Sequence, residues 1–226
     1  DTCFQVALSR CLTEVYQGFD GEHTHRPPWH HALDFYIAED GKSWSGQGES
    51  LDEFYCFGLP VLCPVHGQVV RVRDHLPDNA PGEVDVKNNW GNFVLIRLDS
   101  GLHVLLAHLR QYSAKVKESE WVVPGKLLGS CGNSGRSPQP HLHLQVQQHQ
   151  SLGSSTLPFH LVSTLTSSDS DAPRFRLVAR PSEGDSVQRA DEDPGLAAAL
   201  QLPVGRTLTY ALRSADGARD EQELAV

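Results

Sequence analysis

The stretch His141-Leu-His-Leu-Gln-Val-Gln147 alternates polar and apolar residues throughout. Such alternation is typical of a β-strand, in which successive side chains point to opposite faces. His141 and His143 then share one face, while the two leucines and Val146 point the other way, into a core. Two imidazoles on one strand face can serve one metal ion, or one can bind metal while its neighbour handles protons. Because an H-x-H pair alone fits a structural role equally well, the surrounding sequence has to decide.

Short strand-like segments also precede this stretch, and turn residues separate them. We predict strands at 32–38, 69–73, 92–98, 102–109 and 127–130. Asp99-Ser100-Gly101 joins two of them as a hairpin. Polar insertions interrupt them at 39–53 and 77–90, and no helix is indicated before residue 150. Many short strands separated by turns predict a mainly β fold.

Composition changes after residue 150, where Ser, Thr and Asp become frequent. Linker-like stretches at 151–155 and 164–172 alternate with short apolar runs at 175–178 and 206–212. We therefore predict one domain over residues 1–150. Residues 151–226 are expected to form a linker and a small β appendage, with a disordered end after Arg213.

The bulk composition excludes several classes of protein. The chain has 226 residues, of which 39% are hydrophobic, which is enough for one good core and a smaller unit. Its net charge of −9 gives no electrostatic footprint for nucleic acid or an anionic membrane. We find no apolar run of roughly eighteen residues and no signal peptide at residue 1. Because the sequence contains no Met, we expect a processed protein or a piece of a longer one, which could carry a signal or membrane anchor.

Cysteine and histidine usage bears on metal binding. The five cysteines are Cys3, Cys11, Cys56, Cys63 and Cys131. None forms a C-x-x-C pair, which argues against a cysteine-based zinc site. Cys3 could bridge to Cys11 and Cys56 to Cys63, but the odd count leaves at least one thiol unpaired in the monomer. The twelve histidines are many for this length and make a metal site worth seeking.

A second polar cluster lies far upstream of the H-x-H pair. His23, His25, His30 and His31 precede Asp34, which belongs to the strand predicted at 32–38. Zinc favours imidazole and carboxylate ligands, and a catalytic zinc site keeps one position open for water. Two histidines and one aspartate with an open position fit that rule.

Several further segments, in order, resemble motifs of one known family. They are Gly58–Val70 ("GTPVYAPADGVV"), Gly91–Ile96 ("GNYVII"), Ala107-His108-Leu109 ("AHL"), Pro124–Gly129 ("KGQVIG"), Gly132–Ser137 ("GNTGRS") and Pro140–Leu144 ("PHLHF"). Together they resemble the lysostaphin/LytM-type zinc metallopeptidases, which include peptidoglycan DD-metalloendopeptidases. The resemblance implies a two-layer antiparallel β-sheet groove with one Zn²⁺ ion. It also implies cleavage of peptide cross-links in bacterial peptidoglycan, and hence a periplasmic, extracellular or cell-envelope location.

The resemblance also implies a role for each candidate residue. His143 and Asp34 would be metal ligands, whereas His141 and His108 would be catalytic, handling protons and stabilising the developing oxyanion. The chain has no H-E-x-x-H motif, so the glutamate-base scheme of helical zinc peptidases does not apply.

The first histidine ligand has two candidates. The common family pattern places it four residues before the aspartate, at His30. However, Trp29–Phe35 resembles a sub-branch reading W-x-x-A-L-D-F, whose ligand follows a Gly-rich run in a Ser/Thr-His dipeptide, here Thr24-His25. We favour His25, with His30 left open. His31 ranks last, because on an ideal strand it points away from Asp34.

Other readings place the same residues in different classes of protein. One is a catalytically inactive or regulatory LytM-like module that binds the cell wall or a partner wall hydrolase. Another is a different zinc hydrolase or hydratase in which His141 and His143 both bind the metal. A third is a regulatory domain of a larger membrane protein. The acidic surface is no obvious match for an anionic wall polymer, and insertions at 39–53 and 77–90 would lie near the groove rim.

Overall fold

The structure is a computed structural model that describes residues 3–5, 7–8, 13–168, 172–190, 207–213 and 219–225. Backbone contacts divide the chain into two compact units, Asp1–Arg189 and Ala190–Val226. The first unit contains the large sheet, and the second contains a β-hairpin. Among the described residues, no helix has the length and apolar character needed to cross a membrane.

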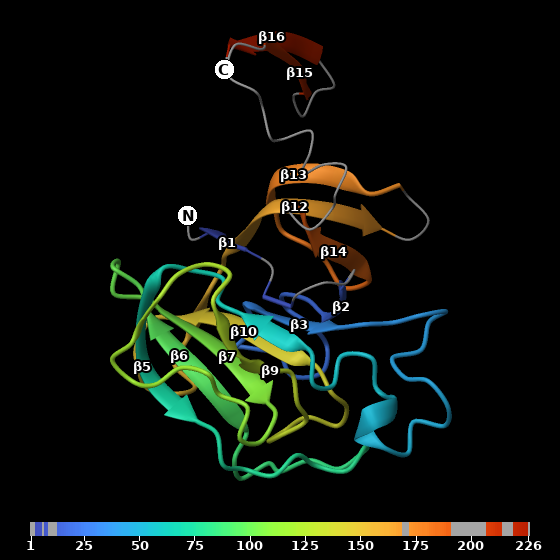
Figure 1. Ribbon diagram of the computed structural model, residues 1–226, viewed down its shortest axis with the longest axis vertical. Helices are drawn as coiled ribbons and strands as arrows, with labels where there is room; N and C mark the ends of the chain where they lie inside the picture. Colours follow the sequence, from blue (N-terminus) through green and yellow to red (C-terminus); the bar gives the residue numbers. More distant parts are fainter. Residues whose placement is uncertain are drawn as a thin grey trace. The chain divides into compact units, whose positions relative to one another are not determined.

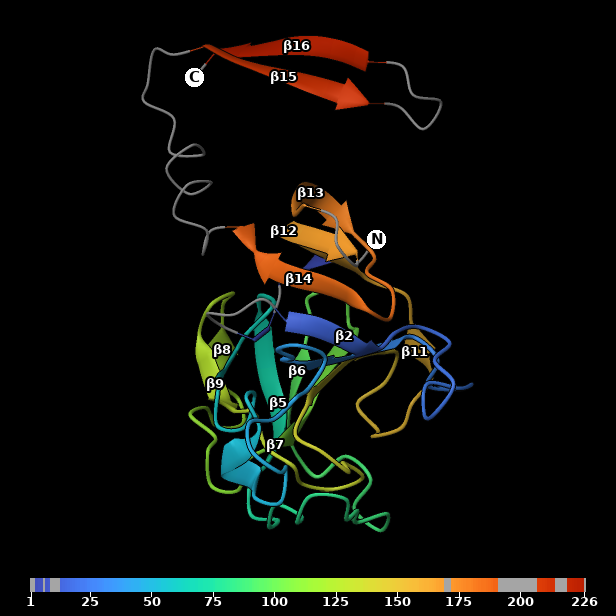
Figure 2. The same ribbon diagram turned by 90° about the vertical axis from the view of Figure 1, so that its right-hand side faces the viewer.

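One 12-stranded sheet dominates the first unit (Figures 1 and 2). Its strands are β1 (Cys3–Phe4), β2 (Thr13–Gln17), β3 (Ala32–Tyr36), β5 (Gly67–Arg73), β6 (Asn92–Arg97), β7 (His103–Leu109), β8 (Trp121–Val122), β10 (Leu142–Gln147), β11 (Thr156–Leu157), β12 (His160–Ser168), β13 (Arg174–Ala179) and β14 (Asp185–Arg189). They lie in the order β1-β12-β14-β2-β3-β10-β7-β6-β5-β8, with β11 beside β10 and β13 beside β12. The pairing of β1 with β12 is parallel, and the other pairings in this sheet are antiparallel.

A second, two-stranded sheet pairs β4 (Pro60–Leu62) with β9 (Leu127–Ser130). The prediction of a mainly β, antiparallel fold is therefore confirmed. The five strands predicted upstream of residue 141 overlap β3, β5, β6, β7 and β9. No α-helix occurs before residue 150 in the described part of the chain, as predicted. The one helical element there is a short 3₁₀ turn, η1 (Leu51–Glu53).

The main core lies between the large sheet and the β4–β9 sheet, which gives the fold two layers. Leu142, Leu144 and Val146 of β10 are fully buried in one apolar cluster with Val61 of β4 and Leu128 of β9. Full burial of an aliphatic side chain contributes about 1.5–3 kcal/mol to stability. The apolar face of the H-x-H strand thus fixes which way its histidines point.

The opposite face of β10 is buried as well. His143, Gln145 and Gln147 point to that side, and each of these residues is at most 5% exposed. A smaller apolar cluster there consists of Trp90, Phe93, Leu95, Leu105 and Ala107, with Trp29, Val70 and Leu152 packed against it. Polar side chains in such a setting need hydrogen-bond partners within the protein.

The sheet continues past residue 150, where the sequence predicts a domain boundary. Strand β11 pairs with β10, and β12, β13 and β14 lie side by side next to β2 (Figure 2). Thr164, in a stretch predicted as linker, is fully buried in β12, which pairs on both sides. Threonine is β-branched and favours strands, so a Ser/Thr-rich composition does not by itself make a linker. The division between the compact units falls instead at Arg189/Ala190.

The second unit contains an antiparallel hairpin of β15 (Thr207–Arg213) and β16 (Arg219–Ala225). The first of these strands coincides with the apolar run predicted at 206–212. The stretch predicted as a disordered end includes β16, whose backbone pairs with that of β15 over residues 219–225. Disorder after Arg213 stays a prediction. Residues 191–206 lie outside the described part of the chain.

Three of the cysteines are buried free thiols: Cys56, Cys63 and Cys131. The bridge considered between Cys56 and Cys63 is therefore not formed. The thiol of Cys63 donates to the carbonyl of Val65, and burial raises its pKa to about 11. Cys11 and the side chain of Cys3 lie outside the described part, so that pairing stays a prediction.

The insertion at 77–90 is firmly attached to the loop before the H-x-H strand. Asn79 Nδ2 donates to the carbonyls of Asn133 at 2.8 Å and Gly135 at 2.7 Å. The Gly82 N–H donates to the Pro138 carbonyl at 2.7 Å. These bonds hold one polypeptide segment against another that leads directly into β10.

Gly91 tests how much this close approach matters. Its φ is +55°, and a Cβ at this position would lie 2.2 Å from the Ser134 carbonyl oxygen. Gly91→Ala should therefore lower the free energy of unfolding by about 2–4 kcal/mol, because backbone has to move. Gly82→Ala is the control, since φ there is +85° but nothing lies within 4 Å of the added carbon. Only the conformational cost of about 1–2 kcal/mol is expected there. Equal losses in chemical denaturation would contradict this account.

Candidate metal centre

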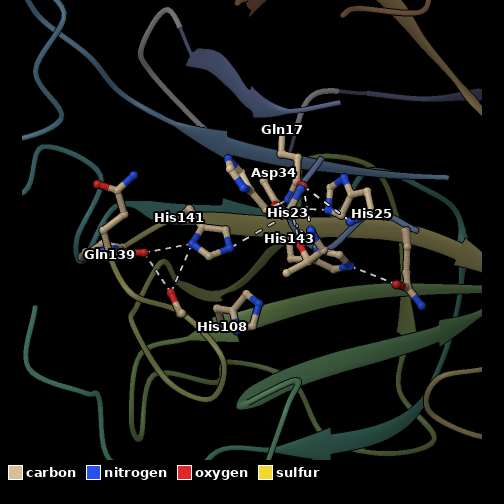
Figure 3. A network of polar contacts seen from close by, with 12 residues as sticks. Gln17, His23, His25, Asp34, His108, Gln139, His141 and His143 are labelled. Atoms are coloured by element: carbon tan, nitrogen blue, oxygen red, sulfur yellow. Dashed lines mark hydrogen bonds and ion pairs between the residues drawn. The ribbon is translucent and has the colours of Figure 1, made fainter. Parts of the chain in front are cut away.

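Asp34 and His143 face each other on adjacent strands. They are register partners in the antiparallel pairing of β3 with β10. Side chains directly opposite each other in such a pair lie within contact distance. His143 Nδ1 is accordingly 2.7 Å from Asp34 Oδ1 (Figure 3). On its other side His143 is paired with Ala107 of β7, which brings the next residue, His108, to the same region.

His25 reaches the same carboxylate from the loop between β2 and β3. Its Nε2 atom lies 3.2 Å from Asp34 Oδ2, and the side chain is 1% exposed. The ring donates Nδ1–H to the Gly18 carbonyl at 2.7 Å, which leaves the Nε2 lone pair directed at the site. Nε2 is buried and has no hydrogen-bond partner. A buried imidazole nitrogen that has no hydrogen-bond partner and lies beside a carboxylate is suited to binding a metal ion.

His30 and His31, the two other candidates for the first ligand, lie elsewhere. Their ring centroids are 3.9 Å apart, and His31 Nδ1 is 3.3 Å from the Thr156 carbonyl. Neither belongs to the group that converges on Asp34. The structure therefore brings His25, rather than His30 or His31, to the carboxylate.

Gln17 positions this loop, and sequence reasoning did not single it out. Its Oε1 accepts from the backbone N–H groups of His23 at 3.0 Å and Thr24 at 2.9 Å, while Nε2 donates to Asp34 Oδ2 at 3.1 Å. A bulge in β2 between Val15 and Gln17 shifts the register at this point. One buried amide thus links the His25 loop to the carboxylate.

His141 and His108 complete the cluster. The Nδ1–H groups of both rings donate to backbone carbonyls at 2.8 Å, those of Gln139 and Ser134 respectively. Their Nε2 atoms are therefore the free nitrogens. His141 Nε2 lies 3.9 Å from Asp34 Oδ1, and the two rings are 4.7 Å apart (Figure 3).

His108 has a strained backbone as well. Its φ is +63°, a left-handed conformation that costs a residue with a side chain about 1–2 kcal/mol. Outliers of this kind cluster at functional sites, where the surrounding structure enforces them.

Burial and mutual proximity set the charges of these groups. Burial by itself would raise the pKa of Asp34, but the neighbouring His25, His141 and His143 hold it well below its usual value. Burial opposes protonation of His25 too, yet Asp34 outweighs it and raises the pKa of that imidazole. Burial lowers the pKa of His141. Burial, with His141 and His143 nearby, holds the pKa of His108 well below its usual value. An ionised carboxylate thus lies beside two imidazoles that are neutral at pH 7.

His25, Asp34 and His143 fit a divalent metal ion. One potential ligand atom from each lies within 4.8 Å of the others, and all three residues are buried. Two imidazole nitrogens and a carboxylate oxygen form the donor set of several catalytic zinc sites. His141 is not part of this group of three potential ligands.

A cavity of about 290 Å³ opens over the cluster. Its walls include Tyr16, Gln17, His23, Thr24, Trp29, Asn89, Trp90, Arg136 and Pro138, together with the five residues of the cluster. The Trp90 ring lies 5.3 Å from that of His143 and 5.5 Å from that of Trp29. The end of the 77–90 insertion therefore forms part of the wall, whereas no residue of the 39–53 insertion lines this cavity.

Comparison with known proteins identifies the domain. The model of peptidase family M23 matches residues 49–154. The chain contains a peptidase family M23 domain. The match includes His108, His141 and His143, whereas His25 and Asp34 precede it.

Individual relatives cover limited parts of the chain. The DD-carboxypeptidase/endopeptidase Mpg of Neisseria meningitidis is 38% identical over 61 residues, which is 27% of this chain and 14% of that protein. The chain thus spans only a small part of these curated relatives. The catalytic domain of lysostaphin from Staphylococcus simulans is 19% identical, with a TM-score of 0.39 over 64% of this chain and 84% of that one. A zinc-containing peptidase from Vibrio cholerae is 20% identical, with a TM-score of 0.35 over 63% and 33%.

The buried neutral His108 predicts a pH-dependent stability for the metal-free protein. Because its folded pKa lies well below 6.5, the unfolded chain binds the extra proton first as the pH falls. Stability should therefore be complete above pH 6.5 and decline below it, by about 1.4 kcal/mol per pH unit for one such group. His108→Gln should flatten this decline between pH 6.5 and 5. The exposed His66 provides the control as His66→Gln, and identical slopes in all three proteins would contradict the prediction.

Proposed function

We propose that this protein is a zinc-dependent endopeptidase that hydrolyses peptide bonds in the cross-links of bacterial peptidoglycan. The M23 domain supports a peptidase. The observation that carries the proposal further is the convergence of His25, Asp34 and His143 beneath a cavity that also presents His108 and His141. A substrate of this kind also implies a place in the cell envelope or outside the cell.

Three residues would hold the ion. His25 offers Nε2, His143 offers Nδ1, and Asp34 offers a carboxylate oxygen. Bound there, zinc supplies a Lewis acid and a means of activating water near neutral pH. The hydrogen bonds from His25 to Gly18 and from Gln17 to Asp34 hold two of these ligands in orientation before any metal arrives.

His141 and His108 are suited to moving protons. Both pKa values lie below the usual value for histidine, so both rings are neutral at pH 7 and their Nε2 atoms can accept a proton. We assign them the transfer of a proton from the attacking water to the leaving amine, and stabilisation of the oxyanion once protonated. Because the carbonyls of Gln139 and Ser134 fix Nδ1–H, neither ring needs to turn over.

The walls of the cavity suit a peptide that carries carboxylate groups. The surface-exposed Arg136 lines the cavity and brings a positive charge to an otherwise acidic protein. Trp29 and Trp90 provide an apolar wall on the His143 side. A guanidinium can bind a carboxylate of a peptidoglycan stem peptide, and this local charge offsets the unfavourable net charge.

Separate substitutions should divide metal binding from catalysis. Asp34→Ala and His143→Ala should lose zinc, because each removes a ligand and leaves the others without their partner. His141→Ala should keep one zinc per chain and lose about 10²–10⁴-fold in turnover, the usual contribution of a general acid–base. Zinc content by elemental analysis and fragments released from purified peptidoglycan, identified by mass spectrometry, measure the two effects.

His66→Ala is the control, since this histidine is exposed and contacts Asp99 and Trp121, outside the cluster around Asp34. Full zinc content and activity in the Asp34 variant would refute the ligand assignment. Stoichiometric zinc without any peptide release by the unaltered protein would point to a regulatory LytM-like module instead.

A further inference from the structure

Two glutamines extend the polar face of β10 beyond His143. Gln145 and Gln147 are 0% exposed, although both carry a polar amide. Gln145 Oε1 lies 2.9 Å from His143 Nε2, and Gln145 Nε2 donates to Gln147 Oε1 at 2.9 Å. Gln147 Nε2 in turn donates to the carbonyls of His149 and Ser151. The three side chains thus form a single hydrogen-bonded row that ends on the main chain.

The row has a fixed direction. A backbone carbonyl can only accept, so the end of Gln147 facing His149 and Ser151 has to be its NH₂ group. Its oxygen then faces Gln145 and requires the NH₂ group of that residue. The oxygen of Gln145 is left facing His143 Nε2, which therefore has to carry a hydrogen.

This arrangement reverses the orientation of His143 relative to the rest of the cluster. The rings of His25, His108 and His141 donate Nδ1–H to backbone carbonyls and leave Nε2 free. His143 instead has Nε2 tied to Gln145 and Nδ1 turned toward Asp34. The nitrogen that His143 turns toward the site is thus selected by a side chain and not by the backbone.

We propose that Gln145, oriented by Gln147, is a positioning residue that keeps hydrogen on His143 Nε2 and presents the Nδ1 lone pair to the metal. This inference rests on the zinc site proposed above. Partners of this kind, which hold the second nitrogen of a histidine ligand, fix its tautomer and ring orientation.

Gln147 is needed because the two ends of an amide have nearly the same shape. If Gln145 turned over, its NH₂ group would face Nε2 and favour the tautomer with hydrogen on Nδ1, the atom that would otherwise bind the metal. The carbonyls of His149 and Ser151 prevent this by fixing Gln147 first. Trp29 Nε1 donates to the Gly153 carbonyl at 2.8 Å and attaches the loop that carries both carbonyls.

The first test is zinc affinity, measured by competition with a chromophoric chelator. Gln145→Met removes the acceptor at nearly constant volume and should weaken zinc binding about 10–100-fold. Gln145→Glu again offers an oxygen to Nε2–H and should bind zinc more tightly than the Met variant. Gln147→Met frees the Gln145 amide to turn over and should weaken binding less than Gln145→Met does. Gln148→Met is the matched control, because Gln148 is exposed and its side chain lies outside the row. This variant should bind zinc like the unaltered protein.

The second test is the tautomer itself, read from long-range ¹H–¹⁵N correlations of the imidazole rings in the metal-free protein at pH 8. The unaltered protein should show a hydrogen on His143 Nε2, also where Nδ1 shares a hydrogen with Asp34 Oδ1 at 2.7 Å in the absence of metal. Gln145→Met should lose the Nε2 hydrogen in a substantial fraction of the molecules. A merely structural role of Gln145 would change thermal stability without moving this signal. If Gln145→Met fails to fold, the Gln147→Met spectrum and the affinity of Gln145→Glu decide the question.

The outcomes separate this inference from the proposed function. An unaltered protein that binds no zinc refutes the zinc site, while the tautomer measurement still reports on the row. Normal zinc binding in the unaltered protein, with unchanged affinity and tautomer in Gln145→Met, overturns the role of Gln145 and leaves the zinc site standing.

Discussion

The burial of the Asp34 carboxylate is the constraint on which the rest of the site depends. An ionised carboxylate taken out of water is costly unless charges and hydrogen bonds replace the lost hydration. Here His25 contacts Oδ2, His143 contacts Oδ1, and Gln17 donates a hydrogen bond to Oδ2. These partners come from the β2–β3 loop, β10 and β2, so the site assembles only when those strands pair in register. A register slip of one residue would turn Asp34 and His143 to opposite faces and leave a buried charge alone.

The parts of this arrangement that follow strand periodicity were predictable from sequence. Alternation over 141–147 places His143 on one face and Leu142 on the other, and the structure has both as expected. The choice between His25 and His30 could not be made this way. His30 satisfies the spacing rule relative to Asp34, but it lies just before β3 begins at Ala32, where strand periodicity no longer holds. His25 reaches the carboxylate because its loop is folded over Gln17, a long-range effect that local spacing does not contain.

The site residues that could not be predicted from the sequence were missed for one shared physical reason. Gln17, Gln145 and Gln147 are ordinary surface residue types, and nothing in their local pattern shows that other segments will cover them. Burial makes them informative, because a buried amide with both ends satisfied fixes the orientation of its neighbours. The same holds for the chain after residue 150. Composition suggested a linker at 164–172, whereas pairing on both sides of β12 makes residues 164–168 part of the sheet.

Because the Gln145 side chain is uncharged, it also leaves the net charge of the metal site unchanged. A divalent ion bound by His25, His143 and the single carboxylate of Asp34 would leave a net charge of about +1 in the site. That residual charge favours electrophilic activation of a carbonyl and stabilises a developing oxyanion. A carboxylate at position 145 would accept the same hydrogen bond from His143 Nε2. It would offset the positive charge of the metal site, because only the imidazole ring of His143 would separate it from the ion. It would also have no hydrogen to donate to Gln147, whose own amide is fixed by the carbonyls of His149 and Ser151. An amide is therefore the group that can hold His143 in place without weakening the positive potential at the cavity floor.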